Sequence, residues 1–270
     1  MRAPILSLIL LTGVSACVLG HRGVVALEAD YPLAGIDAIR LELPDTPLTI
    51  VGSPTATSLS LSGYWSAVGG SQQIAADNVT APALDFARDG RFAILSAIIP
   101  LAARDLVDLE LTDFTMPADR DLEIWSGLGD IQVAHVEGNI SIDLDAGHIE
   151  VFGGAGGVGV RTGAGDLEII STGNVSGSTR SGQIHVVQEG VGGGDIVMSA
   201  LYGDIDVELA ADANLDLQIA AGGDIRVQTS TVSTVTSRRF VREVGNGAVK
   251  IWLEAPYGRV TVRLREQAAP

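Results

Sequence analysis

The strongest constraint on the fold is a tripeptide that recurs about every nine residues from residue 127 onward: Gly, a polar residue, then an aliphatic one. Alternate occurrences fall into two classes. The Asp-rich class begins at Gly129, Gly147, Gly165, Gly182, Gly203 and Gly223. The Asn-rich class begins at Gly138, Gly156, Gly173, Gly194 and Ala213. Members of the first class recur at intervals of about 17 to 21 residues, so each period contains two distinct corners.

This repeat predicts an all-β fold, a parallel β-solenoid with coils of about 18 residues in a single elongated domain. Gly permits a positive φ at a tight corner, and Asn and Asp tolerate left-handed conformations and bond to nearby backbone. The tripeptide Ile131-Gln132-Val133 is typical of the residues after each corner, with both aliphatic side chains on one face of a strand. Coils stacked about 4.8 Å apart would bury these side chains, which no coil can do alone. A helical interpretation is disfavoured because each interior Gly would cost about 1 kcal/mol.

We divide the chain into four segments: a signal peptide at 1–16, a lipidated Cys and tether at 17–35, irregular N-terminal β coils at 36–120, and a regular β-solenoid with a C-terminal cap at 121–266. In the third segment, Ser66–Ala83 is expected to be a loop. The strand-like runs there are Ile36–Leu43, Leu48–Val51, Leu59–Tyr64, Phe92–Ile98 and Leu106–Leu111. The charged strand Val260–Arg265 is expected to cap the stack and to block edge-to-edge aggregation.

The N-terminus resembles a bacterial lipoprotein signal. Arg2 precedes an apolar run, Ile5–Ala16, that is too short for a membrane-spanning helix. The run ends Val14-Ser15-Ala16-Cys17, which is similar to the lipobox, and Cys17 is the only cysteine of the chain. The resemblance implies acylation of Cys17, cleavage before it, and, since Val18 is not Asp, sorting to the outer membrane. An ordinary signal peptide with an incidental cysteine is the alternative.

The composition excludes several classes of protein. One Cys excludes a disulfide scaffold, a zinc ribbon and an iron–sulfur cluster. A net charge of −16 argues against nucleic acid as a partner and against electrostatic attraction to an anionic membrane. The membrane is therefore expected as a partner through the lipid anchor alone.

The repeats resemble the bacterial putative-adhesin family of β-strand repeats, a domain of unknown function. The stretch from Met116-Pro117-Ala118 through Gly129-Asp130-Ile131 is similar to that family's entry into its repeat. The resemblance is close over residues 120–230 and loose over 36–119. It implies an exported envelope protein with a parallel β-solenoid and a non-enzymatic role. Gln183 and His148, which replace Asp, and an insertion at 237–244 depart from the pattern.

The acidic corners are the main candidate site. If the register holds, Asp130, His148, Asp166, Gln183, Asp204 and Asp224 form one column, with Gln132, Glu150, Glu168, His185, Asp206 and Arg226 beside it. Structural turn chemistry explains these residues, and we predict no metal site. Asp130, Asp166, Asp204 and Asp224 are the only candidates for binding a divalent cation.

No Ser-His-Asp or paired-acid motif accompanies His135, His148 or His185, so we predict no catalysis and no cofactor. Other candidates for contact with a partner are Arg238, Arg239 and Arg242, which could pair with phosphates or acidic glycans, and Trp65, Trp125 and Trp252, which could stack on sugars. The expected function is that of a lipid-anchored envelope protein with a structural, adhesin-like or interaction role and an envelope protein or glycan as partner. Two alternatives stay open: a component of envelope-stress signalling, and a polysaccharide-acting β-helix enzyme, which would show a cleft of acids and Arg.

Overall fold

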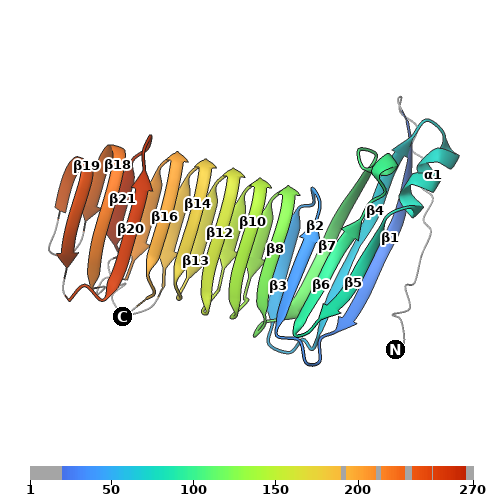
Figure 1. The fold of residues 1–270 in the computed structure, drawn as a ribbon, viewed down its shortest axis with the longest axis horizontal. Helices are drawn as coiled ribbons and strands as arrows, with labels where there is room; N and C mark the ends of the chain where they lie inside the picture. Colours follow the sequence, from blue (N-terminus) through green and yellow to red (C-terminus); the bar gives the residue numbers. More distant parts are fainter. Residues whose placement is uncertain (1–19, 190–192, 211–213, 229–232, 245, 266–270) are drawn as a thin grey trace.

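The computed structural model describes residues 20–189, 193–210, 214–228, 233–244 and 246–265. They form 21 β-strands, one α-helix and one short 3-10 helix, so the prediction of an all-β fold is confirmed. Within these residues no helix is long and apolar enough to cross a membrane. Figure 1 shows most of the strands side by side in one long stack.

The regular part of the stack consists of coils that each contain a first strand and a shorter second strand. The coils are β8 (Asp121–Leu128) with β9 (Ile131–Ala134), β10 (Asn139–Ala146) with β11 (Ile149–Phe152), β12 (Gly157–Ala164) with β13 (Leu167–Ser171), β14 (Val175–Ser181) with β15 (Ile184–Gln188), and β16 (Ile196–Tyr202) with β17 (Ile205–Leu209). Each strand pairs in parallel with its equivalents on the neighbouring coils. We call the outward surface of the first strands the first-strand face and that of the second strands the second-strand face.

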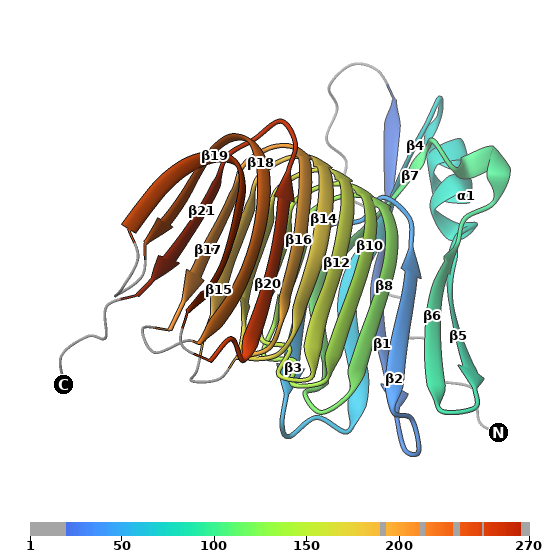
Figure 2. The same ribbon diagram turned by 60° about the vertical axis from the view of Figure 1, so that its left-hand side comes forward.

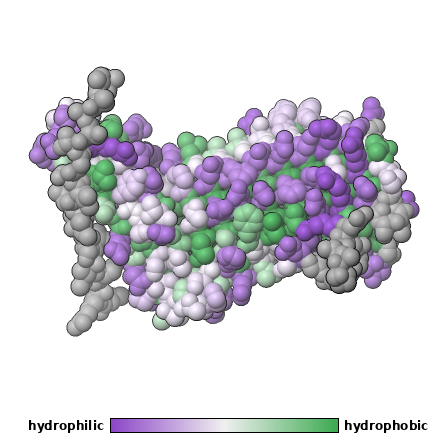
Figure 3. Space-filling view, turned by 180° about the vertical axis from the view of Figure 1, so that it is seen from behind, coloured by the Kyte–Doolittle hydropathy of each residue, from purple (hydrophilic) through white to green (hydrophobic). Residues whose placement is uncertain are grey.

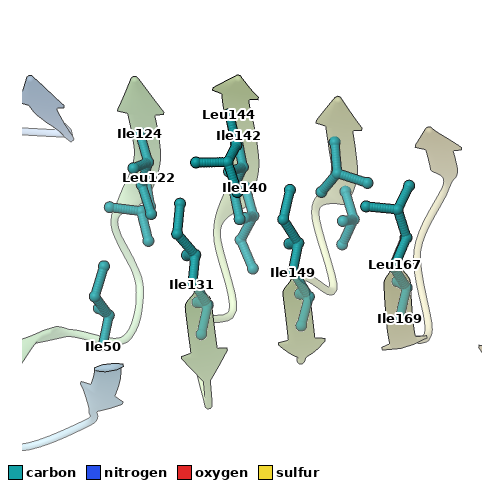
Figure 4. Close-up of a cluster of buried hydrophobic side chains, with 14 of the residues drawn as sticks. Ile50, Leu122, Ile124, Ile131, Ile140, Ile142, Leu144, Ile149, Leu167 and Ile169 are labelled. Carbon is teal, nitrogen blue, oxygen red and sulfur yellow. The ribbon is translucent and has the colours of Figure 1, made fainter. Parts of the chain in front are cut away.

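The core lies between the two sets of strands. Alternate residues of each strand point inward, so Ile131, Ile149 and Leu167 stack one above the next, each at most 1% exposed. Figure 4 shows these side chains facing Leu122, Ile140 and others from the first strands. Burying one such side chain contributes about 1.5–3 kcal/mol, and a single coil without neighbouring coils would leave much of it exposed to water.

At its N-terminal end the sheet divides into two branches, which we call the N-terminal sheets. The first coil, β2 (Ala38–Leu43) and β3 (Leu48–Ser53), pairs in parallel with β8 and β9. On the other side β2 pairs with β6 (Phe92–Ile98), which is antiparallel to β5 (Ala83–Asp89). The strand β3 pairs with β7 (Val107–Pro117), which is antiparallel to β4 (Ser58–Gly69), and β4 pairs with β1 (His21–Pro32).

Side chains from both sheets close this end. Tyr31 of β1 stacks on Phe86 of β5 with ring centres 4.3 Å apart. The helix α1 (Gln72–Thr80) covers β1 and β4 through the buried Ala75 and Val79 (Figure 2). A short 3-10 helix, η1 (Leu101–Ala103), leads into β7. The N-terminal sheets are therefore built from antiparallel as well as parallel pairs.

Two sequence predictions for this region are wrong. The segment predicted as a tether, 17–35, contains β1, whose Val25 and Leu27 alternate inward against the core, while Cys17 lies outside the described residues. The loop predicted at Ser66–Ala83 contains the end of β4 and α1. The helix begins where the Ser71 hydroxyl accepts a hydrogen bond from the Ile74 N–H at 3.2 Å, an N-cap that the prediction overlooked.

The order of coils at the C-terminal end differs from the order of the sequence. The strands β20 (Val249–Ala255) and β21 (Val260–Leu264) pair with β16 and β17 on one side. On the other side both pair with β18 (Leu215–Gln228), which is antiparallel to β19 (Ser233–Val244). The chain therefore passes over one coil position, forms β18 and β19, and then returns to fill the position that it passed over.

This arrangement corrects two further predictions. The charged strand Val260–Arg265 lies inside the stack as β21 and not at its end, which β18 and β19 form instead. Its charge has an internal partner, because Arg263 pairs with Asp206 of β17. Gly223 is not the corner next to Gly203; it lies within β18, where the pairing changes from β20 to β21, and its backbone N–H donates to the Gly258 carbonyl oxygen at 2.8 Å. The glycine that follows Gly203 in space is Gly258, whose added Cβ would lie 1.8 Å from the Gly203 carbonyl oxygen.

Candidate functional site

The Asp column on the second-strand side is a set of hydrogen bonds between coils. One carboxylate oxygen of Asp130 accepts the backbone N–H of His148 at 2.9 Å, and Asp166 does the same for Gln183 at 2.6 Å. Asp204 accepts the backbone N–H of Arg259 at 2.8 Å. Each side chain therefore fastens its own corner to the equivalent corner of the next coil. We call this contact an inter-coil clasp.

The Asn-rich corners use the same device. Asp121 accepts the backbone N–H of Asn139 at 2.8 Å, and Asn174 accepts that of Asp195 at 2.9 Å. Asp195 in turn accepts the backbone N–H of Lys250 at 2.9 Å. Turn chemistry was the expected role of these polar residues, but their side chains bond to the neighbouring coil and not only to their own turn.

The corner glycines of the Asp-rich class meet backbone from the coil before. Gly129, Gly147, Gly165 and Gly182 have φ between 122° and 153°, a region that other residues rarely adopt. A Cβ on Gly203 would lie 1.7 Å from the Gly182 carbonyl oxygen. In the Asn-rich class a Cβ on Gly138 or Gly173 would lie within 2.7 Å of a backbone oxygen of the preceding coil. These corners therefore need glycine for close approach as well as for conformation.

The predicted column does not run from Asp204 to Asp224, because Arg259 of the returning coil lies between them. Arg259 donates to the Asp204 carboxylate through Nη2 at 2.7 Å and Nε at 3.1 Å. Partial burial works to raise the pKa of Asp204, but the side-chain hydrogen bond, the backbone N–H and the charge of Arg259 together lower it below 3.8. One of the four candidate cation ligands is thus already neutralised by an arginine.

The second-strand face carries a group of three side chains that the prediction did not single out. His148, Glu150 and Glu168 place one ligand atom each within 4.8 Å of one another. Glu150 accepts a hydrogen bond from Gln132 at 2.7 Å and lies 3.2 Å from the His148 ring Nε2. Within the described residues this is the only such group, and it includes none of the four Asp candidates. Figure 3, seen from behind, shows hydrophilic side chains running along the stack.

Further along the second-strand side lies a hollow of about 360 Å³ where acids and arginines meet. Burial raises the pKa of Asp206, the charges of Arg263 and His185 oppose that shift, and Glu208 adds to it. Its Oδ2 pairs with Arg263, and its Oδ1 is buried without a hydrogen bond in the described part of the chain. The charged side chains that line the hollow are Asp204, Asp206, Asp224, Arg226 and Arg259, beside His185.

The first-strand face carries a groove of about 460 Å³ that runs across β8, β10, β12, β14 and β16. Its floor is formed by small residues and one pair of opposite charges: Ser141, Asp143, Gly159, Arg161, Ser176, Ser178 and Ser199. Trp125 lines one end and is 49% exposed. Val197 lines the other end, directly opposite Trp252 of β20, which is 57% exposed.

The remaining predicted contact residues are scattered. Trp65 is 4% exposed and belongs to the core, so it cannot stack on a sugar. Arg238, Arg239 and Arg242 are exposed on β19, which lies at the end of the stack (Figure 1). His135 lies at a corner with φ 59°, apart from the His148 group. The groove floor was missed because its serines and glycines occupy outward strand positions, where the repeat pattern sets no expectation.

Comparison with known proteins gives only weak similarity. No family model matches the chain, and no curated protein matches it. A solved "putative adhesin" from Bacteroides fragilis is 12% identical, over 89% of this chain and 97% of that one, with a TM-score of 0.40. A solved "putative cell adhesion protein" from Clostridium sporogenes is 12% identical, over 92% of this chain and 100% of that one, with a TM-score of 0.34.

Proposed function

We propose that this protein is a lipid-anchored component of the bacterial cell envelope whose β-solenoid stack has a structural or adhesin-like binding role without catalysis. The observation that carries this proposal is the first-strand face, where parallel pairing in register holds outward side chains in straight rows across six strands. Such rows form a rigid surface that loses little entropy when it binds a partner. The stack of parallel coils described above supports the choice of a solenoid over other all-β folds.

The lipid anchor rests on the sequence. Val14-Ser15-Ala16-Cys17 has the form of a lipobox, and the sole cysteine of the chain occupies its last position. Several acyl chains give lasting attachment, whereas one chain gives only marginal binding. An outer-membrane location follows if the sorting rule applies to Val18.

The anchor is tested by expressing the full precursor with Cys17→Ala and with Cys17 intact in a bacterium that processes lipoproteins. We expect the intact protein to label with a fatty-acid probe and to partition into the detergent phase, and the Cys17→Ala protein to appear in the soluble fraction without label. Ser15→Ala, which keeps a small residue in the lipobox, is the matched control. Detergent partition of the Cys17→Ala protein would contradict the lipoprotein assignment.

A second candidate function, action on polysaccharide, is favoured by the hollow on the second-strand side, because it brings acids and arginines together as such an enzyme would need. The raised pKa of Asp206 suits a general acid. Against this, Asp204 and Asp206 are each paired with an arginine in the structure. The test is incubation of the purified chain with a polysaccharide panel, followed by end-group analysis. Cleavage that is lost in Asp206→Asn but kept in Glu150→Gln would establish the enzyme and overturn the non-catalytic proposal.

Envelope-stress signalling, the other alternative, has no specific support in the structure and stays an expectation from the sequence alone.

A further inference from the structure

We propose that the groove on the first-strand face binds an extended, neutral glycan chain between Trp125 and Trp252. This inference rests on the proposed binding role and names the chemical class of the partner. Four features of the described residues support it: the position of Trp125, the position of Trp252, the chemistry of the floor between them, and the charge of the surroundings.

Trp125 lies at one end of the groove, and contacts with neighbouring side chains hold its ring in place. The Arg40 guanidinium of β2 lies 4.6 Å from the centre of the Trp125 ring, and Glu123 holds Arg40 with a 2.8 Å hydrogen bond. Arg40 comes from one side of β8, and the groove residues come from β10 to β16 on the other. The arginine therefore supports the ring from behind, by a cation–π contact, and leaves it beside the open groove. An aromatic ring fixed in this way offers an apolar face to a ligand at little cost in entropy.

Trp252 lies one strand beyond the far end of the groove. Its strand, β20, is the neighbour of β16, and Trp252 is directly opposite Val197, which lines the groove. From β8 to β20 the strands follow in the order β8, β10, β12, β14, β16, β20. Five spacings of about 4.8 Å place the backbones of Trp125 and Trp252 roughly 24 Å apart along the stack, in two neighbouring outward rows. This distance fits a short oligosaccharide lying along the stack axis and is far longer than a single sugar.

The floor between the two rings has hydrogen-bonding groups but no bulk. Two rows of outward residues cross it: Ser141, Gly159 and Ser176 in one, and Asp143, Arg161, Ser178 and Ser199 in the other. Serine hydroxyls both donate and accept hydrogen bonds, as sugar hydroxyls do. Gly159 leaves space, since the nearest atom to a Cβ added there is the Ser176 hydroxyl at 3.4 Å. Small polar side chains between two exposed indole rings suit a ligand that has apolar ring faces and hydroxyl groups at the edges of its rings.

Charge argues for a neutral polymer. The chain carries a net charge of −16, and Asp143 on the floor is offset by Arg161 in the register position beside it. A polyanionic glycan would meet repulsion from the protein as a whole, and the arginine on the floor occupies the register position beside a carboxylate. A polycation would be attracted to the entire acidic surface and would have no reason to select the groove.

The experiment uses the mature chain without its acyl groups, purified in the folded state. Three neutral hexasaccharides, cellohexaose, chitohexaose and maltohexaose, and one acidic oligosaccharide of galacturonic acid are titrated against it by calorimetry and by tryptophan fluorescence. We expect at least one neutral hexasaccharide to bind with a change in tryptophan emission, and the acidic one to bind at least tenfold more weakly. Trp125→Ala and Trp252→Ala should each weaken binding by roughly three- to tenfold.

Two further variants separate the groove from general effects of mutation. Gly159→Gln should fill the floor and abolish binding while the melting temperature stays close to that of the unchanged protein. Tyr257→Ala removes an exposed aromatic ring outside the groove, stacked on Tyr202 at 5.0 Å, and should leave glycan affinity unchanged. Loss of affinity in Tyr257→Ala, or retention of it in the Trp125→Ala, Trp252→Ala double variant, would overturn the assignment of the groove.

Failure of this inference is distinguishable from failure of the proposed function. If no neutral hexasaccharide binds at millimolar concentration, the glycan assignment is wrong. Crosslinking on intact cells with the lipidated double variant then tests the wider proposal. The same envelope partner captured with and without the two tryptophans would keep the binding role and move it to another surface; preferential binding of the acidic oligosaccharide would replace the neutral class with an acidic one.

Discussion

Replacing Gly165 by Ala tests most directly whether the corner glycines hold the stack together. Gly165 has φ +144°, and a Cβ placed on it would lie 1.9 Å from the carbonyl oxygen of Gly147 on the preceding coil. The conformation alone costs an L residue about 1–3 kcal/mol. The contact adds to this cost because the opposing atom is backbone, which can move only if two coils separate locally. We therefore expect a loss of about 3–5 kcal/mol in the free energy of unfolding.

For a chain of this length such a loss lowers the melting temperature by roughly 10 °C. The measurement is thermal unfolding followed by circular dichroism, with urea unfolding as a second method. Gly159→Ala is the matched control, because Gly159 lies in the strand just before the same corner and a Cβ there comes no closer than 3.4 Å to any neighbour, the Ser176 hydroxyl. The control should unfold within about 0.5 kcal/mol of the unchanged protein. Equal melting temperatures for the two variants would refute the assignment of Gly165 as an inter-coil contact point.

Two shorter predictions concern the clasps. Asp166→Ala should lower the free energy of unfolding in urea by about 1–2 kcal/mol, because it leaves the Gln183 N–H without its acceptor. The control Asp145→Ala, at an exposed position of β10, should change that free energy by less than about 0.5 kcal/mol. Since Arg259 lowers the pKa of Asp204, that carboxylate stabilises the fold at neutral pH, and the contribution is lost as the pH falls below 3.8. A carboxyl titration by NMR should show a higher pKa for Asp204 in Arg259→Gln; an unchanged value would contradict the pairing.

The all-β class could be predicted because the repeat has the strict spacing that stacked coils require. Every coil must place a glycine where the backbone of the preceding coil passes, and two apolar residues where the core lies. The spacing from Gly129 to Gly165 reflects that requirement directly, and these corners lie between consecutive strands. The N-terminal sheets obey no such rule. Some pairs there are antiparallel. The alternation of residues around Val25 and Leu27 could therefore indicate a strand, but it could not indicate which strand pairs with it.

The order of coils at the C-terminal end could not be predicted from spacing. Gly223 and Gly258 are both followed, after one residue, by an aliphatic residue, and either could have come next after Gly203. The structure selects Gly258, since its strand offers Arg259 to Asp204 and Arg263 to Asp206. If β18 took that position, Asp224 would stand beside Asp204 and repel it. Complementary charge thus favours the non-sequential order.

The candidate site was predicted only in part for a related reason. The inward positions and the corners repeat, so they are visible in the sequence, whereas the outward positions on each strand vary freely. Trp125 and Trp252 were noted as residues that could stack on sugars, but their wide separation in the sequence hid the fact that only four strands separate β8 from β20. Distance in the stack depends on the order of coils, and that order was the part that the repeat did not determine.

The non-sequential order leads to a last prediction, on truncation. A chain that ends at Val244 would lose an internal coil, not a terminal strand, although only positions 245–270 are removed. That coil contributes Ile251, Leu253, Val260 and Val262, each at most 1% exposed, and burial of each is worth about 1.5–3 kcal/mol. The sum of roughly 6–12 kcal/mol is comparable with the entire stability of an ordinary domain. We therefore expect the truncated chain to expose β16 and β17 to rapid proteolysis, whereas a chain ending after Leu264 should resist as the full protein does. If the truncated chain keeps the melting temperature of the full one, β18 can close directly onto β16 and β17, and the returning coil is not needed to join them.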